Sequence, residues 1–264
     1  MIIDGRGLAG EIIGNLKKKN KPPRLSIGAV LVGGNAASLS FLKQKSKTAE
    51  KSGIGFKVFE FDSRIAAARL KREILKLNQD KNINGIIVQL PLPKHVNPDE
   101  ILAAIDPKKD VDALSKRPLV LAPTLGAVKF IFKKYRIGYK DKEILIIGRG
   151  RLVGQPIYKW LVKENKRVKV IDERQKNRFP KFTRNADIII SGVGKGGLIK
   201  GEMIKRGTIL IDFGFDRKDG KITGDFDFKS CVKKAKLITP VPSGMGPIMV
   251  AMLFKNLVKL NKKS

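Results

Sequence analysis

The stretch Glu143-Ile-Leu-Ile-Ile-Gly-Arg-Gly-Arg-Leu-Val-Gly-Gln-Pro156 decides the fold of this chain. An apolar run ends at Gly148, further glycines follow at 150 and 154, and an amphipathic segment begins at Ile157. A buried strand that runs through a glycine turn into a helix presents free backbone N–H groups to a phosphate. The Gly-x-Gly-x-x-x-Gly spacing is one residue longer than the usual dinucleotide fingerprint. It predicts a phosphate-binding βα turn, and a tight turn without a ligand is the alternative.

Strands and helices are expected to alternate on both sides of this stretch. The expected strands of the second half lie at 143–147, 167–172, 187–192, 208–213 and 237–239. In the first half, strands are expected at 25–32, 55–61 and 85–90, and helices at 35–51, 63–77 and 98–104. Such alternation predicts an α/β fold with parallel sheets, and the second half is typical of a doubly wound, Rossmann-type dinucleotide-binding unit.

A segment without clear periodicity divides the chain. Residues 106–124 are rich in Pro, Lys and Asp and show neither a helical nor a strand pattern. We therefore predict an N-terminal α/β domain over 1–118 and a dinucleotide-binding domain over 119–246, with a cleft between them. The amphipathic segment 247–264 predicts a terminal helix that packs back on the first domain.

The net charge of this chain is strongly positive. Its 264 residues include 55 Lys and Arg against 24 Asp and Glu, which gives +31. Such a field attracts nucleic acid, anionic membranes or acidic small molecules. The basic residues are spread along the whole chain, however, and neither zinc-finger spacing nor an RNA-recognition signature is present. We expect no specific nucleic-acid binding, and a non-enzymatic nucleic-acid-binding protein is a remote alternative.

Other protein classes are disfavoured by single features of the sequence. No apolar run approaches the roughly 20 residues that a membrane span needs, so no membrane partner is expected. The only cysteine, Cys231, cannot form an internal disulfide, which suits a cytoplasmic protein. The only histidine, His95, has no ligand-type residue at metal-binding spacing, so no metal site is predicted.

Several short motifs, taken together, have the order and spacing of one enzyme family. They are Ile2-Ile-Asp-Gly5, Val88-Gln-Leu-Pro-Leu-Pro93, Lys109-Asp-Val-Asp112, Gly148-Arg-Gly-Arg-Leu-Val-Gly-Gln-Pro156, Ile211-Asp-Phe-Gly214, Gly224-Asp225 and Thr239-Pro-Val-Pro-Ser-Gly-Met-Gly-Pro247. Over nearly its whole length the chain resembles the bifunctional methylenetetrahydrofolate dehydrogenase/methenyltetrahydrofolate cyclohydrolase family.

The resemblance implies two consecutive reactions on tetrahydrofolate derivatives. A hydride passes from the one-carbon bridge of 5,10-methylenetetrahydrofolate to NADP, and water then opens the methenyl product to 10-formyltetrahydrofolate. These reactions belong to one-carbon metabolism and supply purine biosynthesis. The family also implies a homodimer.

The resemblance assigns catalytic roles to Lys45, Gln89 and Asp112. Lys45 would handle the protons of the hydrolysis, and it follows Phe41 by four residues, which places both on one face of a helix. Gln89 would hydrogen-bond the lysine, and Asp112 would bind N–H groups of the pterin. The implied substrate-binding residues are Phe41, Leu90, Pro91, Pro242, Gly244, Gly246 and Pro247.

The implied cofactor-binding residues lie mainly in loops after strands. They are Gly148, Arg149, Gly150, Val153, Gly154, Pro156, Arg174, Gly192, Val193, Gly194, Asp212 and Gly214. An acidic residue such as Asp172 after the second strand favours the free ribose hydroxyl of NAD. Arg149 and Arg174 suit the additional phosphate of NADP. We predict NADP and leave NAD open because of Asp172.

Several residues depart from the family pattern, and three of them bear on the hydrolysis. Phe41 replaces a tyrosine, and Ala113 and Ser243 stand where glycine is typical. The changes leave Lys45, Gln89 and Asp112 in place. The alternative function is therefore a dehydrogenase with weakened or lost cyclohydrolase activity.

Overall fold

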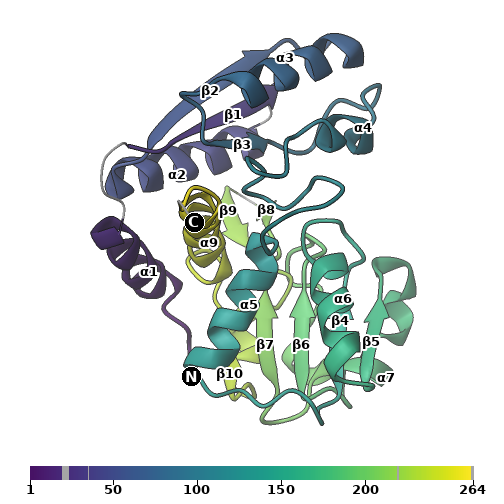
Figure 1. Cartoon of the computed structure of the whole chain (residues 1–264). Coiled ribbons are helices and arrows are strands. Elements are labelled where there is room, and N and C mark those ends of the chain that lie inside the picture. The colour runs from purple at the N-terminus through teal and green to yellow at the C-terminus, as the bar shows by residue number, and fades with distance from the viewer. Residues whose placement is uncertain (20–23, 35, 219, 263–264) are drawn as a thin grey trace. The chain divides into compact units, whose positions relative to one another are not determined.

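The computed structural model describes residues 1–19, 24–34, 36–218 and 220–262 (Figure 1). They form two compact units, each with its own parallel sheet. The three-stranded unit comprises Gly10–Pro123 and Val250–Ser264, and the five-stranded unit comprises Met1–Ala9 and Thr124–Met249. The α/β fold with two parallel sheets confirms the predicted fold class. The division after Pro123 lies beyond the boundary predicted after residue 118.

The three-stranded sheet has the order β2-β1-β3, with all strands parallel. Its strands are β1 (Ser26–Val32), β2 (Gly55–Phe61) and β3 (Gly85–Val88), and its main helices are α2 (Ala36–Ser52), α3 (Ala67–Gln79) and α4 (Pro98–Ala103). All residues of β3 and nearly all of β1 are buried, as expected for parallel strands covered on both faces. Asn35, the first residue of the predicted helix 35–51, lies outside the described residues.

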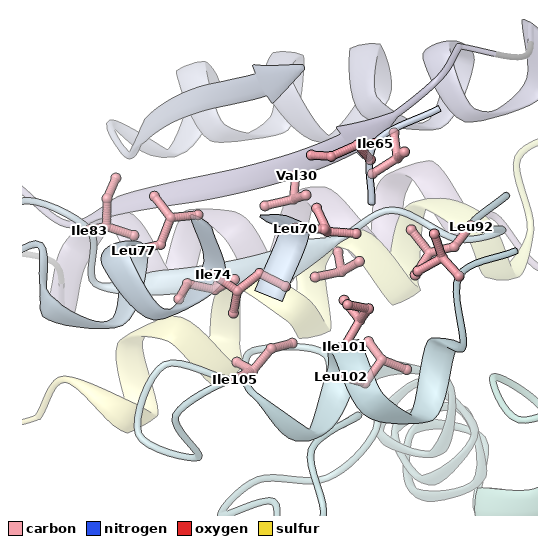
Figure 2. Packing of buried hydrophobic residues seen from close by; sticks show 14 residues of the cluster. Val30, Ile65, Leu70, Ile74, Leu77, Ile83, Leu92, Ile101, Leu102 and Ile105 are labelled. Carbon is pink, nitrogen blue, oxygen red and sulfur yellow. The ribbon is translucent and has the colours of Figure 1, made fainter. Parts of the chain in front are cut away.

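The core of the three-stranded unit follows the helical spacing of α3. Leu70, Ile74 and Leu77 are buried on one face of this helix. They belong to one apolar cluster with Val30 of β1 and Ile101 of α4, among others (Figure 2). The predicted helix 63–77 starts later, at Ala67, because residues 62–65 form a turn in which the Ile65 N–H donates to the Asp62 carbonyl at 3.0 Å.

The five-stranded sheet has the order β10-β7-β6-β4-β5, again with all strands parallel. The strands are β4 (Ile144–Ile147), β5 (Val168–Ile171), β6 (Ile188–Ser191), β7 (Ile209–Asp212) and β10 (Leu237–Ile238). From β4 the chain first adds β5 on one side and then returns to add β6 on the other. The strand order therefore reverses between β4 and β6, where doubly wound folds bind their ligands.

Helices α5 (Pro123–Lys134), α6 (Gly154–Glu164), α7 (Phe179–Thr183) and α8 (Phe228–Cys231) belong to this half of the chain. Each expected strand of the second half is present and is shorter by one or two residues at its ends. The hairpin β8 (Asp216–Lys218) and β9 (Lys221–Thr223) and the short 3-10 segments η1 (Glu173–Arg178) and η2 (Gly201–Met203) were not predicted.

Hydrogen bonds hold the first residues of the chain and helix α9. The sequence patterns predicted no element before residue 25, yet the chain begins with α1 (Gly5–Lys19). Before this helix, Ile2 bridges Ile238 of β10, and the Ile3 N–H donates to the Ile238 carbonyl at 3.0 Å. In α9 (Met245–Leu260), Asn256 donates to the carbonyls of Val111 at 2.9 Å and Leu121 at 2.8 Å. The last part of α9 thus belongs to the three-stranded unit, as the division of the chain also indicates.

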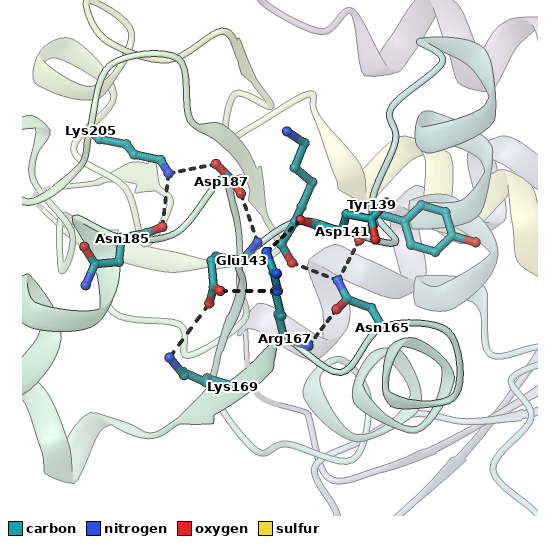
Figure 3. Close-up of polar contacts among 10 residues, drawn as sticks. Tyr139, Asp141, Glu143, Asn165, Arg167, Lys169, Asn185, Asp187 and Lys205 are labelled. Carbon is teal, nitrogen blue, oxygen red and sulfur yellow. Dashed lines mark hydrogen bonds and ion pairs between the residues drawn. The ribbon is translucent and has the colours of Figure 1, made fainter.

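The amino ends of β4, β5 and β6 carry a polar network (Figure 3). The Asp187 carboxylate accepts the Glu143 N–H at 2.9 Å and the Lys205 ammonium at 2.7 Å. Asn165 donates to the carbonyls of Tyr139 at 2.6 Å and Lys142 at 2.8 Å. This network lies at the end of the sheet opposite the glycine turn, and it ties the segments that precede β4, β5 and β6 to one another.

Candidate active site

Helix α2 holds Lys45 in a half-buried position. Lys45 shares a helix face with Phe41, whereas Lys43 and Lys47 are exposed. Lys45 Nζ donates to the Gln89 side-chain oxygen at 3.1 Å. The structure thus singles out one lysine of this helix, the one that the resemblance indicated, by its burial and its partner.

Gln89 follows β3 directly and is 8% exposed. Its backbone N–H donates to the Val30 carbonyl at 2.9 Å, and its side-chain NH₂ donates to the Leu90 carbonyl at 2.8 Å. These bonds fix the side chain, so its oxygen faces Lys45 as an acceptor. The strand predicted through residue 90 ends at Val88, and the next residues are free to form the site.

Asp112 lies in the loop that follows a parallel bridge between Ile86 and Asp110. Burial raises the pKa of the Asp112 carboxyl, Lys45 acts to lower it, and Asp110 adds to the increase. The Asp112 carboxylate thus lies within electrostatic reach of the Lys45 side chain. Lys45, Gln89 and Asp112 are therefore brought together within the three-stranded unit, although they are far apart in the sequence.

The loop that carries Asp112 is held by residues that the sequence analysis did not single out. Asp110 is 0% exposed, and its carboxylate accepts the Ser115 N–H at 2.7 Å. Asn256 binds the Val111 carbonyl from α9. Between them, Ala113 has a φ of 57°, a left-handed conformation that favours glycine. This backbone gives a physical reason for the glycine typical of the family at this position, and here an alanine adopts it.

The glycine turn after β4 has two kinds of glycine. Gly148 has a φ of 103°, and a Cβ at position 154 would lie 1.9 Å from the Gly148 carbonyl oxygen. These two glycines are required by the turn itself. A Cβ at position 150 would meet no atom within 4 Å. The open space at Gly150, beside the N-terminus of α6, fits the approach of a dinucleotide phosphate.

The loop after β6 meets the glycine turn at the point where the strand order reverses. A Cβ at position 148 would lie 2.9 Å from the Gly192 carbonyl oxygen. Gly192 and Val193 are half-buried, as are Val153 and Pro156 at the start of α6, and Gly194 is exposed. The two loops that the resemblance assigned to the cofactor are therefore neighbours within the five-stranded unit.

Asp172, at the end of β5, is bound by both arginines that were considered for the cofactor phosphate. Arg174 donates to its carboxylate at 3.1 Å, and Arg149 approaches it with Nε at 3.8 Å. The hydrogen bond from Arg174 lowers the pKa of Asp172, and the charge of Arg149 adds to this effect. The acidic residue is thus ionised and surrounded by an excess of positive charge.

Asp212 was expected among the cofactor residues, and the structure places its carboxylate inside the five-stranded unit. It is 3% exposed and accepts the N–H groups of Gly214 at 2.7 Å, Asp225 at 3.2 Å and Phe226 at 3.1 Å. Burial, and after it the charge of Asp225, raises the pKa of Asp212 to about 7. Gly214 is buried beside it.

The expected substrate-binding residues are divided between the two units. Phe41, Leu90 and Pro91 belong to the three-stranded unit, and Pro91 is exposed. Those of the final loop belong to the five-stranded unit, where Pro242 is exposed, Gly244 is buried, and Gly246 and Pro247 are half-buried at the start of α9. Ser243 has a φ of 86°, so this second replacement of a family glycine also sits in a backbone that favours glycine.

The only histidine and the only cysteine of the chain are not among the site residues discussed above. Among the described residues, no three His, Cys, Asp or Glu side chains gather as metal ligands, and the His95 ring contacts the Ile65 carbonyl at 3.1 Å. Cys231 is fully buried, and burial raises the pKa of its thiol to about 12. In the part of the chain that is described, no helix is long and apolar enough to cross a membrane.

Comparison with known proteins agrees with this geometry. The catalytic-domain model of the tetrahydrofolate dehydrogenase/cyclohydrolase family matches residues 3–112, and its NAD(P)-binding-domain model matches residues 122–264. The bifunctional protein FolD of Nautilia profundicola is 39% identical over 277 positions, which cover 99% of this chain and 97% of that protein.

Solved structures show the same likeness. The bifunctional dehydrogenase/cyclohydrolase FolD of Campylobacter jejuni is 36% identical and has a TM-score of 0.92, with 98% of each chain covered. The Trypanosoma brucei enzyme, solved with NADP and an inhibitor, is 29% identical and has a TM-score of 0.93, with 98% of this chain and 96% of that chain covered. The chain therefore belongs to the tetrahydrofolate dehydrogenase/cyclohydrolase family.

Proposed function

We propose that this protein oxidises 5,10-methylenetetrahydrofolate with NADP and then hydrolyses the methenyl product to 10-formyltetrahydrofolate. The observation that carries the proposal is the hydrogen bond of 3.1 Å from Lys45 to Gln89, with the Asp112 carboxylate nearby. Membership of the family supports both activities.

The hydrolysis uses the side chains of the three-stranded unit. Water attacks the electron-poor methenyl carbon, and a proton must leave the water before the ring opens. The Lys45 amine, oriented by Gln89, accepts and returns this proton. The Asp112 carboxylate binds N–H groups of the pterin and so holds the methenyl carbon in place.

Hydride transfer depends on residues that hold the cofactor. When bound, NADP supplies the hydride acceptor, and the protein supplies position. Gly148, Gly150 and Gly154 shape the turn that receives the pyrophosphate. Arg149 and Arg174 outnumber Asp172, which they already bind, so the site retains positive charge for the additional phosphate. NAD is the alternative cofactor, since Asp172 could also bind a free ribose hydroxyl.

A dehydrogenase with weakened hydrolysis is the second candidate function. Phe41 supports it, because a phenylalanine next to Lys45 has no hydroxyl to share in proton handling. The preserved contact between Lys45 and Gln89 favours the bifunctional enzyme. The two candidates differ in whether the methenyl intermediate accumulates.

The proposal extends to assembly and location. We expect a cytoplasmic homodimer that supplies one-carbon units for purine biosynthesis, as the family resemblance implies. The buried, unpaired Cys231 suits a reducing compartment. Light scattering on the purified protein tests the dimer, and a monomer at micromolar concentration would contradict it.

Lys45→Met is the decisive variant. We expect methenyl hydrolysis to fall by about 10²- to 10⁴-fold, the usual contribution of a positioned acid or base. The assay follows the near-ultraviolet absorbance of the methenyl compound, and oxidation is measured separately with NADP and with NAD. Lys43→Met is the matched control, because Lys43 lies on the same helix and is exposed.

The outcomes separate the candidates. Normal hydrolysis in Lys45→Met would show that the lysine has been assigned wrongly. Accumulation of the methenyl compound by the unmodified enzyme would favour the weakened-hydrolysis candidate. A clear preference for NAD would overturn the choice of NADP.

A further inference from the structure

Asp225 is a fully buried carboxylate to which the sequence analysis gave no role in the site. It accepts the Ser191 hydroxyl at 2.6 Å. It also accepts three successive backbone N–H groups, those of Val193 at 2.7 Å, Gly194 at 2.9 Å and Lys195 at 2.8 Å. One internal carboxyl group therefore fixes the end of β6 and the loop that follows it.

The direction of these N–H groups matters for ligand binding. Successive N–H groups that converge on one point form a concave anion site, which in many nucleotide-binding loops receives a phosphate. Here the side chain of Asp225 occupies that position. The N–H groups of Val193, Gly194 and Lys195 are therefore engaged inside the protein, and none of these three remains to bind a phosphate.

A second carboxylate locks the first in place. The Asp225 N–H donates to the Asp212 carboxylate at 3.2 Å. A Cβ at position 214 would lie 2.3 Å from Asp225 Oδ1, and a Cβ at position 224 would lie 2.2 Å from Asp212 Oδ2. Each carboxylate thus fills the space left by a glycine on the opposite segment, which explains why the Asp212–Gly214 and Gly224–Asp225 motifs occur together.

We propose that Asp225 is a positioning residue for the dinucleotide: it fixes the 192–195 loop so that this loop binds an uncharged part of NADP, while the phosphates bind the 148–154 turn. The contact between positions 148 and 192 places the two loops at one site. The inference rests on the proposed function for the identity of the cofactor. It assigns no contact between Asp225 and the ligand.

The test measures NADP affinity in Asp225→Asn. The amide keeps one acceptor oxygen but turns an NH₂ group toward N–H donors, so the loop loses its anchor. We expect the KM and the Kd for NADP to rise by about 10- to 100-fold, with kcat at saturating NADP and methenyl hydrolysis nearly unchanged. Ser191→Ala removes one hydrogen bond and should raise both constants by about 3- to 10-fold.

Asp187→Asn is the matched control. Asp187 also accepts a backbone N–H (Figure 3), but it precedes β6, whereas Asp225 binds the loop that follows β6. The NADP constants of this control should stay within about twofold of the unmodified enzyme, as is usual for a change away from a site. If Asp225→Asn binds NADP normally, or if it loses hydrolysis in the same proportion as NADP binding, the inference is wrong.

An unfolded variant and a failure of the proposed function can each be told apart from a failure of this inference. If Asp225→Asn fails to fold, Ser191→Ala decides, and normal NADP constants in that variant would overturn the inference. If the unmodified enzyme binds NADP but does not oxidise the folate, the proposed function fails. Titration calorimetry with NADP alone still tests the role of Asp225 in that case.

Discussion

The two units place their functional groups at equivalent positions of their sheets, but one unit uses side chains and the other uses backbone groups. In each parallel sheet the order reverses beside the first strand, between β1 and β3 in one unit and between β4 and β6 in the other. The three-stranded unit places the side chains of Lys45 and Gln89 there. The five-stranded unit places backbone there, shaped by glycines and held by the buried carboxylates of Asp212 and Asp225.

This difference predicts two kinds of sensitivity to substitution. A side-chain site can lose its chemistry while the fold survives, because the half-buried Lys45 contributes little to the core. A backbone site has no reactive side chain to remove, but its shape depends on close contacts at the glycines, where an added Cβ would clash. Substitutions in the three-stranded unit should therefore change rates, and those in the five-stranded unit should change stability and cofactor affinity.

Gly154→Ala should have the largest effect on stability. Its Cβ would lie 1.9 Å from a backbone oxygen that belongs to the glycine turn, so the turn must open. We expect a loss of about 3 kcal/mol or more in the free energy of unfolding, measured with urea. Gly150→Ala is the control: no atom lies within 4 Å of the new Cβ, so stability should change by less than about 0.5 kcal/mol while NADP affinity falls.

Equal stability of Gly154→Ala and Gly150→Ala would contradict the description of the turn. Unchanged NADP affinity in Gly150→Ala would show that the phosphates do not approach the open glycine. Either result would weaken the contrast between the two units.

Gln89→Leu should show the converse behaviour, a loss of rate with a smaller loss of stability. It removes the acceptor that orients Lys45, so part of the contribution of a positioned acid or base, about 10²- to 10⁴-fold, is lost. Methenyl hydrolysis should therefore fall by about 10- to 100-fold, less than in Lys45→Met. A variant that hydrolyses normally would show that Gln89 does not orient the lysine.

The sequence predicted the elements whose signals are local. The spacing of Leu70, Ile74 and Leu77 predicted the buried face of α3, and the glycine pattern predicted the turn after β4. Lys45 and Gln89 are 44 positions apart, and no periodicity connects residues at that distance. Only the family resemblance joined them.

Other features could not be predicted from the sequence, because the residues that contact them are remote in the chain. Asp225 meets its N–H donors 30 to 32 positions earlier, so in the sequence it resembles an ordinary turn residue after a hairpin. The burial of Asp212 was missed for the same reason. Residues 5–19 precede the first predicted strand, and their helix escaped notice between the Ile2-Ile-Asp-Gly5 motif and the basic segment that follows.

The stability of the five-stranded unit should depend on the protonation of Asp212. Its pKa is about 7 in the folded protein against an ordinary value of 3.8, so the folded state takes up a proton between these values. This contribution to stability is full below about pH 4 and is lost as the pH rises through 7, by at most about 1.4 kcal/mol per pH unit. The side chain of Asp212→Asn does not titrate. The difference in the free energy of unfolding between the unmodified protein and this variant, measured with urea, should therefore shrink from pH 5 to pH 8.

Asp187→Asn provides the opposite case. Burial acts to raise the pKa of Asp187, but the Lys205 ammonium and the Glu143 N–H lower it below its ordinary value. Its stabilising effect is therefore lost only in more acidic solution, and the difference from the unmodified protein should stay constant from pH 5 to pH 8. If this difference in unfolding free energy changed with pH equally in both variants, burial of Asp212 would not control its protonation.

The smallest expected effects come from restoring glycine at Ala113 and Ser243, one in each unit. Both residues have left-handed backbones, with φ of 57° and 86°, which cost a side chain about 1–2 kcal/mol. Glycine also makes the unfolded chain more flexible, which offsets about 0.4–1 kcal/mol of this gain. Each variant should therefore gain about 0.5 kcal/mol in the free energy of unfolding by the same balance.

The hydrolysis rate of Ala113→Gly tests whether residue 113 helps to position Asp112. Asp110 and Asn256 hold the loop around Asp112 independently of residue 113, so Ala113→Gly should hydrolyse at the normal rate. Gly53→Ala is the reverse control, because Gly53 has a φ of 67° and open space around its Cβ, and it should lose about 1 kcal/mol. If Ala113→Gly instead slowed hydrolysis, the alanine would be maintaining the position of Asp112, and the side-chain site would depend on backbone geometry as strictly as the glycine turn does.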